Sequence, residues 1–184
     1  MNRLFDRFFF FGIVFILPFS CTETKIQSTD PKISYAGEYL LYEAHPFTGI
    51  LVTDLPSVSI KRESSYKNGL LNGEELDLYA NGVTASQRLY EDGKKVGIHK
   101  GYFPDQKPRF LYSYKDNSFH GEYWEWYNSG KVYTYAFYEN GNAKVRKVWR
   151  ENGDIYINYV FSLGKAYGYP GAKLCDQVRG KDGG

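Results

Sequence analysis

The sequence predicts an all-β fold: an elongated antiparallel β-meander of about five 24-residue β-hairpin repeats, largely single-layered. One tyrosine and one glycine recur every 24 residues, and such a period indicates copies of one small supersecondary unit. Aromatic residues, which favour strands, make up 18% of the chain. Each unit also carries two reverse-turn signals. The recurring residues are Tyr66, Tyr90, Tyr114 and Tyr138, together with Gly49, Gly73, Gly97 and Gly121.

Residues 1–20 predict an export signal. Arg3 and Arg7 stand in a short polar head, and an apolar run of 12 residues follows from Phe8 to Phe19. A membrane-spanning helix needs about 20 apolar residues, so this run has the length of a secretion signal. Cys21 follows a small residue at the end of the run, which resembles the lipobox of bacterial lipoproteins. That resemblance implies an acylated Cys21 as the mature N-terminus.

Two alternatives to lipidation stay open at this point. They are an ordinary signal peptide with a chance cysteine, and a retained anchor. A lipobox usually has leucine three residues before the cysteine, whereas Pro18 stands there and Leu17 is one place further back. With lipidation, residues 21–37 form the lipidated cysteine and a tether, because residues 22–34 are polar and lack periodicity. The expected location is the bacterial cell envelope, with the membrane contacted through the N-terminal lipid.

Two sets of turns punctuate each unit. One follows the recurring tyrosine, as in Tyr66-Lys67-Asn68-Gly69, and the other follows the opposite strand end, as in Tyr79-Ala80-Asn81-Gly82. Asn-Gly pairs favour turns in which both central residues have positive φ. Gln106 replaces glycine in one turn, so a different turn is expected there. The repeat glycines singled out are Gly49, Gly69, Gly73, Gly82, Gly93, Gly97, Gly121, Gly130, Gly141 and Gly153.

The segments between turns are short and rich in aromatic and β-branched residues, which predicts strands rather than helices. Residues 121–127 and 131–138 are typical. The first strand is expected near residues 38–42, and ten or eleven strands follow from the count of turns. A one-residue deletion shifts the last unit. The expected repeat domain covers residues 38–164, and residues 165–184 form a C-terminal cap or tail.

Alternation along the strands predicts the two faces of the sheet. Neither face is purely apolar, so we expect cross-strand aromatic ladders to replace a second layer. The densest aromatic ribbon combines Tyr102, Trp124 and Trp126 on one face. An exposed ribbon of this kind is a candidate contact surface, and ladder packing is the alternative interpretation.

Residues that could carry chemistry form no recognisable catalytic or metal-binding motif. The histidines at positions 45, 99 and 120 are expected at the surface beside turns, and Glu122 and Glu125 fall on opposite faces of one strand. Cys175 lies in the tail beside Asp176, which disfavours a reactive thiolate. The net charge of +2 does not indicate a basic surface that binds nucleic acid. We therefore expect neither enzymatic activity, metal nor cofactor.

Residues 42–164 resemble a known family in their turn and strand pattern. The segment Tyr66-Lys67-Asn68-Gly69-Leu70-Leu71-Asn72-Gly73-Glu74 and the opening unit at residues 46–52 are similar to the MORN-repeat variant of bacterial proteins labelled YwqK-family antitoxins. The resemblance implies the hairpin array, and it offers an antitoxin of a toxin–antitoxin system as one function. The export signal favours another: a non-catalytic, lipid-anchored envelope protein whose repeats bind an unknown protein, lipid or cell-wall partner.

Overall fold

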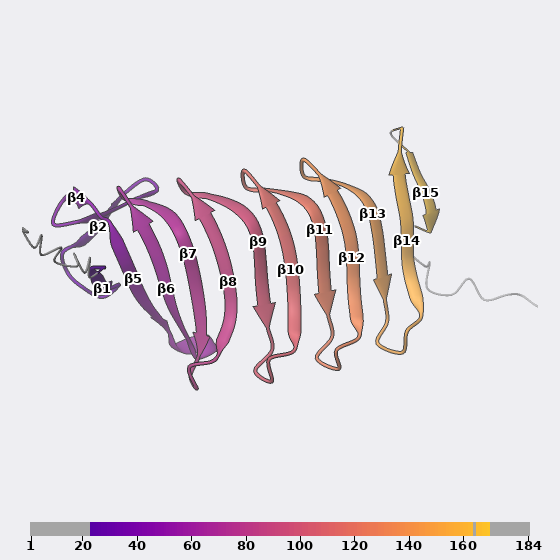
Figure 1. The fold of residues 1–184 in the computed structure, drawn as a ribbon, viewed down its shortest axis with the longest axis horizontal. Helices are drawn as coiled ribbons and strands as arrows, with labels where there is room; N and C mark the ends of the chain where they lie inside the picture. Colours follow the sequence, from indigo (N-terminus) through magenta and orange to yellow (C-terminus); the bar gives the residue numbers. More distant parts are fainter. Residues whose placement is uncertain (1–22, 164, 170–184) are drawn as a thin grey trace, which may run out of the picture.

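The computed structural model describes residues 23–163 and 165–169, and its main feature is one sheet of twelve strands (Figure 1). The strands from β5 to β15 follow one another in chain order, each antiparallel to the next, which confirms the elongated antiparallel meander. Their bounds are β5 Gly49–Leu55, β6 Ile60–Lys67, β7 Leu70–Tyr79, β8 Thr84–Glu91, β9 Lys94–Tyr102, β10 Pro108–Lys115, β11 Ser118–Trp126, β12 Val132–Glu139, β13 Asn142–Trp149, β14 Ile155–Ser162 and β15 Lys165–Tyr169.

The N-terminal end of the array departs from the sequence prediction. Strand β1, Lys25–Gln27, pairs in parallel with β5 and forms the first edge of the large sheet. A separate three-stranded sheet contains β2 Ile33–Ala36, β3 Tyr39–Tyr42 and β4 His45–Pro46. The expected tether is therefore wrong for β1 and β2, since both are paired strands. The strand expected near residues 38–42 exists, but it belongs to the second sheet.

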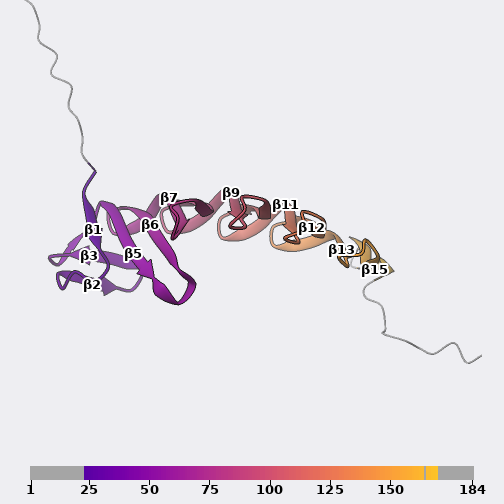
Figure 2. The ribbon, with the colours of Figure 1, turned by 90° about the horizontal axis from the view of Figure 1, so that it is seen from below.

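The apolar core lies where these two sheets meet. Leu40 is fully buried and packs with Ile26, Phe47 and Leu51. Backbone bonds join the layers, because Leu40 N–H donates to the Gly69 carbonyl and Gly69 N–H donates to the Phe47 carbonyl. Figure 2 shows the second sheet beside the first strands only, and the rest of the array as a single layer. The segment that contains β1 and β2 is mainly polar in sequence, and packing and pairing against β3 order it.

At one end of the strands, neighbouring strands are joined by two-residue turns that follow the recurring tyrosines. Both central residues have positive φ in each, as the Asn-Gly pattern predicts. The N–H of the second residue also donates to a carbonyl of the preceding unit, as from Gly93 to Leu71 and from Gly141 to Phe119. These bonds tie neighbouring hairpins together. The central pairs are Asn68-Gly69, Asp92-Gly93, Asp116-Asn117 and Asn140-Gly141.

At the opposite end of the strands, the connections are three-residue loops. This differs from the expectation of the same turn at both ends. Asn81 does not have positive φ, whereas Gly82 has φ +79°, and Gly82 N–H donates to the Tyr79 carbonyl. This is the pattern of a type I turn followed by a left-handed residue. The expectation of a different turn at Gln106 is also wrong. Gln106 has φ +66° and repeats the same backbone bond to Phe103.

A bulge in alternate strands explains the recurring strand glycines. Gly73, Gly97 and Gly121 have positive φ inside strands, and the register shows two extra residues on the glycine strand at each site. Glycine adopts positive φ at little energetic cost, and this explains why glycine recurs at the bulge. Strand β13 has one extra residue at the equivalent place, next to Val145. The deletion in the last unit therefore removed one residue of this bulge.

The two faces of the sheet differ in burial. Strands bend along their length (Figure 1), and we call the more buried face the inner face and the opposite one the outer face. Exposed apolar side chains on the outer face include Leu89 and Ile98. Among the described residues no helix is long and apolar enough to cross a membrane. Buried inner-face residues include Ser64, Glu75, Asp77, Ser86, His99, Thr134, Ala136 and Val148.

Candidate functional site

The inner face of β6 to β8 is held by a network of charges. Arg62 donates two hydrogen bonds to Asp77, at 2.6 and 3.0 Å, and Arg88 donates to both Glu75 and Asp77 at 2.9 Å. Ser86 also donates to Asp77. Burial raises the pKa of Asp77, but the bonds from Arg62 and Ser86 and the charge of Arg88 outweigh it and hold this pKa below its usual value. Two cations thus balance two buried carboxylates.

An aromatic ladder continues the inner face from β8 to β12. His99 lies between the rings of Tyr90 and Tyr114, with centroids 5.7 and 4.6 Å away. Further along, Tyr112 stacks on Tyr123 at 4.3 Å, and both hydroxyls donate to Glu125. Burial, followed by these hydrogen bonds, raises the pKa of Tyr112. Each ring contacts the next, so these side chains pack the single layer.

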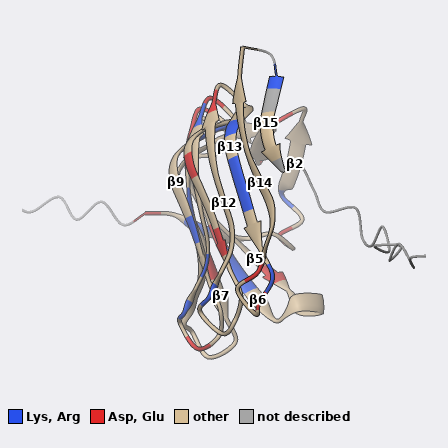
Figure 3. Cartoon of the chain, turned by 90° about the vertical axis from the view of Figure 1, so that its right-hand side faces the viewer, with Lys and Arg blue, Asp and Glu red and all other residues tan. Residues whose placement is uncertain are grey.

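A polar hollow of about 350 Å³ opens beside this ladder. Arg62, Glu75 and Arg88 line one side, and they are already paired with one another. Lys95 lies over the ring of Tyr114 at 5.4 Å. Figure 3 shows acidic and basic segments distributed over the length of the strands. The polar groups of the inner face are thus largely satisfied within the protein, as a structural role requires.

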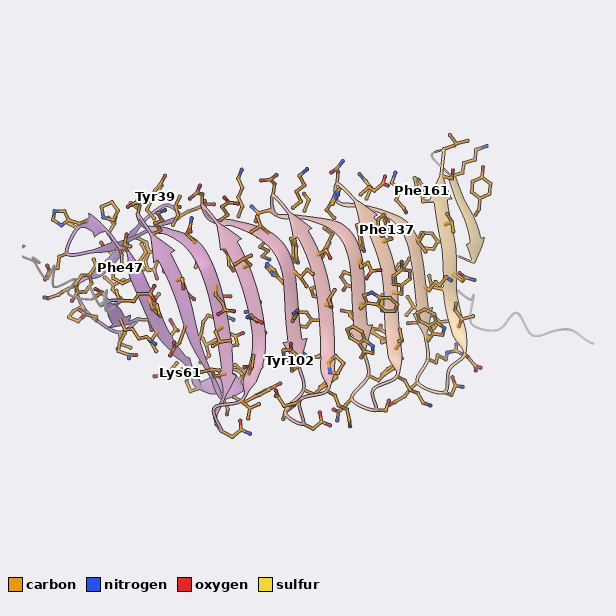
Figure 4. All side chains as sticks on the ribbon, in the orientation of Figure 1. Tyr39, Phe47, Lys61, Tyr102, Phe137 and Phe161 are labelled. Atoms are coloured by element: carbon orange, nitrogen blue, oxygen red, sulfur yellow. The ribbon has the colours of Figure 1, made fainter. Side chains whose placement is uncertain are left out.

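The outer face carries the aromatic residues that the sequence singles out. Trp124 and Trp126 lie nearly parallel, with ring centroids 6.0 Å apart, and Trp124 also contacts Tyr135 at 4.3 Å. Tyr102 lies at the end of β9 near the three-residue turns (Figure 4) and takes part in none of these ring contacts. The predicted ribbon is therefore two tryptophans and Tyr135, with Tyr102 apart from them.

An outer-face groove of about 570 Å³ opens beside Trp124. Its volume lies within the range of small-molecule sites. The Trp124 and Trp149 indoles come from β11 and β13, and Val132 of β12 lies between these strands. We call this the tryptophan groove. Its lining is completed by Gly130, Lys131, Arg150 and Gly153.

Sequence reasoning missed Trp149, Val132 and Lys131 as members of this site. A signal for Trp149 existed, because it follows Trp126 by the same 23 residues that separate Gly130 from Gly153. Lys131 likewise follows Lys107 by one 24-residue period. That Trp124 and Trp149 share a groove depends on how neighbouring hairpins pack, which the period alone does not specify.

The other residues considered from the sequence remain apart. His45 bonds to the Glu43 carbonyl, His120 accepts from Asn140 N–H, and His99 is buried in the ladder, contrary to its expected surface position. Within residues 23–163 and 165–169 no group of three or more His, Cys, Asp or Glu side chains could hold a metal ion. Cys21 and Cys175 lie outside the described residues.

Comparison with known proteins adds no relative. No protein-family model matches the chain, and no curated protein matches it either.

Proposed function

We propose that this protein is a non-catalytic, lipid-anchored protein of the bacterial cell envelope whose hairpin repeats present a binding surface. The tryptophan groove is the observation that supports this proposal best. It is open, lined by two indoles and placed on the outer face, whereas the polar groups of the inner face bind one another. Open repeat arrays commonly offer such extended surfaces to partners.

The N-terminal sequence supports the envelope location. Arg3, Arg7, the apolar run from Phe8 to Phe19 and Cys21 together form an export signal with a lipid attachment site. The partner is a protein, lipid or cell-wall component that the groove contacts. An exported protein does not meet a cytoplasmic toxin, so this function differs in kind from that of an antitoxin.

The proposal is tested by the mature N-terminus and by its consequence for binding. We expect mass spectrometry of the mature protein to find acylated Cys21 as the first residue, and Cys21→Ser to abolish membrane attachment. Trp149→Ala should keep attachment but reduce recovery of envelope components with the purified protein. A mature chain starting after Cys21 would refute the anchor.

Gene deletion separates this function from the antitoxin alternative. We expect deletion to be tolerated whatever genes lie beside it. If deletion is lethal only while an adjacent toxin gene is intact, and a cytoplasmic version lacking residues 1–21 restores growth, the protein is an antitoxin.

A further inference from the structure

The tryptophan groove is lined by indoles from two strands that are not neighbours. Trp124 stands on β11 and Trp149 on β13, with β12 between them. Trp124 is in register with Tyr135, whereas Trp149 lies one residue beyond Val148, closer to the three-residue loops. The two indoles therefore offer apolar faces at successive levels along one groove. The ring of Tyr135, 4.3 Å from that of Trp124, supports one wall from the side.

The charged side chains that line the groove are both basic, which favours an anion, and the nearby Glu122 carboxylate already accepts a hydrogen bond from the Trp124 indole at 3.1 Å. Lys131 and Arg150 are its charged lining residues, and no Asp or Glu lines it in the described part of the chain. The Lys131 ammonium donates one hydrogen bond, to the Glu151 carbonyl at 2.9 Å, and an ammonium has three N–H groups. Lys147 also lies on the outer face, in register with Tyr135. The Arg150 guanidinium lies over the ring of Tyr156, so Lys131 is the better placed cation.

The turn edge of the groove is open to a longer molecule. Gly130 and Gly153 line this edge, and a Cβ built on either glycine meets no atom within 4 Å. A chain that continues beyond the bound ring can therefore leave the groove past the turns. An apolar chain end would gain nothing from the lysine, whereas a sugar has apolar C–H faces for the indoles and polar groups for the rim.

We propose that the tryptophan groove binds an acidic polysaccharide, with sugar rings packed on the Trp124 and Trp149 indoles and a carboxylate on Lys131. The inference rests on the proposed binding function and names the ligand class of that same surface. Sugar C–H groups pack on the indole faces, and Lys131 supplies a charge-assisted hydrogen bond. Val132 closes the floor with an apolar contact.

Intrinsic fluorescence reports directly on this site, because the chain has 3 tryptophans and all belong to this part of the outer face. The purified full chain is titrated with oligogalacturonate, with a neutral cello-oligosaccharide of equal length, and with phosphatidylglycerol vesicles. We expect a saturable change with oligogalacturonate, and affinity at least tenfold weaker for the neutral sugar. Vesicles should leave the groove fluorescence unchanged in Cys21→Ser protein.

Variants separate the ring contact from the charge. Trp149→Ala and Lys131→Ala should each weaken oligogalacturonate binding at least tenfold, and Trp149→Phe should retain most of it. Lys107→Ala is the control, since Lys107 occupies the same repeat position and donates to the Asn128 carbonyl, but lies outside the groove and forms an ion pair with Asp105. Circular dichroism and melting confirm that each variant is folded.

The outcomes separate this inference from the proposed function. Equal losses in the two lysine variants, preference for the neutral sugar or the vesicles, or no response to any sugar would overturn the sugar assignment. In that case, retention of isolated envelope fractions by the wild-type protein would still uphold the binding function. If the protein neither responds to any sugar nor retains envelope fractions, both the sugar assignment and the proposed binding function are refuted.

Discussion

At the scale of single residues, His99 shows how a polar side chain becomes part of the core of a single-layered sheet. It is 2% exposed, and its Nε2 atom lies 2.9 Å from the Leu89 carbonyl. The rings of Tyr90 and Tyr114 cover it from both sides. Burial lowers the pKa of His99, and the positive charges of Arg88 and Lys95 lower it further. The neutral imidazole is the form that this site stabilises.

We predict that the protein loses stability when His99 is protonated. Its folded pKa lies below the unfolded value of about 6.5. The unfolded chain therefore binds more protons in this range, and the free energy of unfolding is highest above about pH 6.5 and falls as the pH drops below it. Chemical denaturation at pH 5 and pH 7.5 measures this difference. His99→Gln should be less stable at pH 7.5 and show a smaller pH difference; an unchanged difference would assign the effect to other groups.

Short polar residues at the turns act through their side chains as well as their backbone. Asn81 does not need positive φ, yet its Oδ1 accepts a hydrogen bond from the Val83 N–H. Asp105 and Asn152 bond in the same way, to Lys107 and Asp154. This side-chain bond explains why Asn and Asp recur there. The same residue type thus serves two different turns.

At the scale of elements, the three-residue loops show that a turn can form against the local conformational preference of its residues. Gln106 adopts a left-handed conformation in the same loop that uses Gly82, Gly130 and Gly153 elsewhere. A non-glycine residue there costs about 1 to 2 kcal/mol. The flanking strands are already paired in register, so the hairpin imposes the loop geometry on glutamine. Neighbouring strands therefore outweigh the local penalty.

Exchanging the residues of two such loops tests this account. We predict that Gln106→Gly raises the free energy of unfolding by up to about 1 kcal/mol, whereas Gly130→Gln lowers it by about 1 kcal/mol. A side chain at Gly130 meets no neighbouring atom, so its cost is a backbone cost. The exposed bond from Gln106 to the Thr84 carbonyl reduces the gain in the first variant. Urea denaturation of both variants should give shifts of opposite sign; shifts of the same sign would contradict the shared loop geometry.

At the scale of the whole molecule, apolar burial is concentrated at the N-terminal end. The core cluster of Ile26, Leu40, Phe47 and Leu51 lies between the two sheets, whereas the remaining array relies on aromatic ladders and ion pairs. A second layer is thus present only over the first strands. The two-sheet core therefore covers the N-terminal end of the repeat array.

We predict that Leu40→Ala destabilises the protein by about 2 to 5 kcal/mol, because Leu40 is fully buried and its truncation leaves a cavity. Ile98→Ala on the exposed outer face is the control and should change stability by about 0.5 kcal/mol or less. Thermal and urea unfolding followed by circular dichroism measure both. Similar effects of the two substitutions would show that β2 to β4 are not needed to stabilise the array.

The hairpin array could be predicted from the sequence by itself because its signals are local. Asn68-Gly69 and its repeats specify tight turns, and the 24-residue period repeats one hairpin register. Alternation also placed Glu122 and Glu125 on opposite faces, since successive side chains of a strand alternate. These features need only residues close together in the chain.

Only the tertiary structure decided what depends on contacts between distant segments. Strand β1 and the sheet of β2 to β4 are ordered by pairing with β5 and by burial of Leu40, which a polar sequence does not reveal. The tryptophan groove likewise arises because β11 and β13, which carry Trp124 and Trp149, lie on either side of β12. The physical reason is that local turn and strand preferences act within one hairpin, whereas burial and grooves form between hairpins.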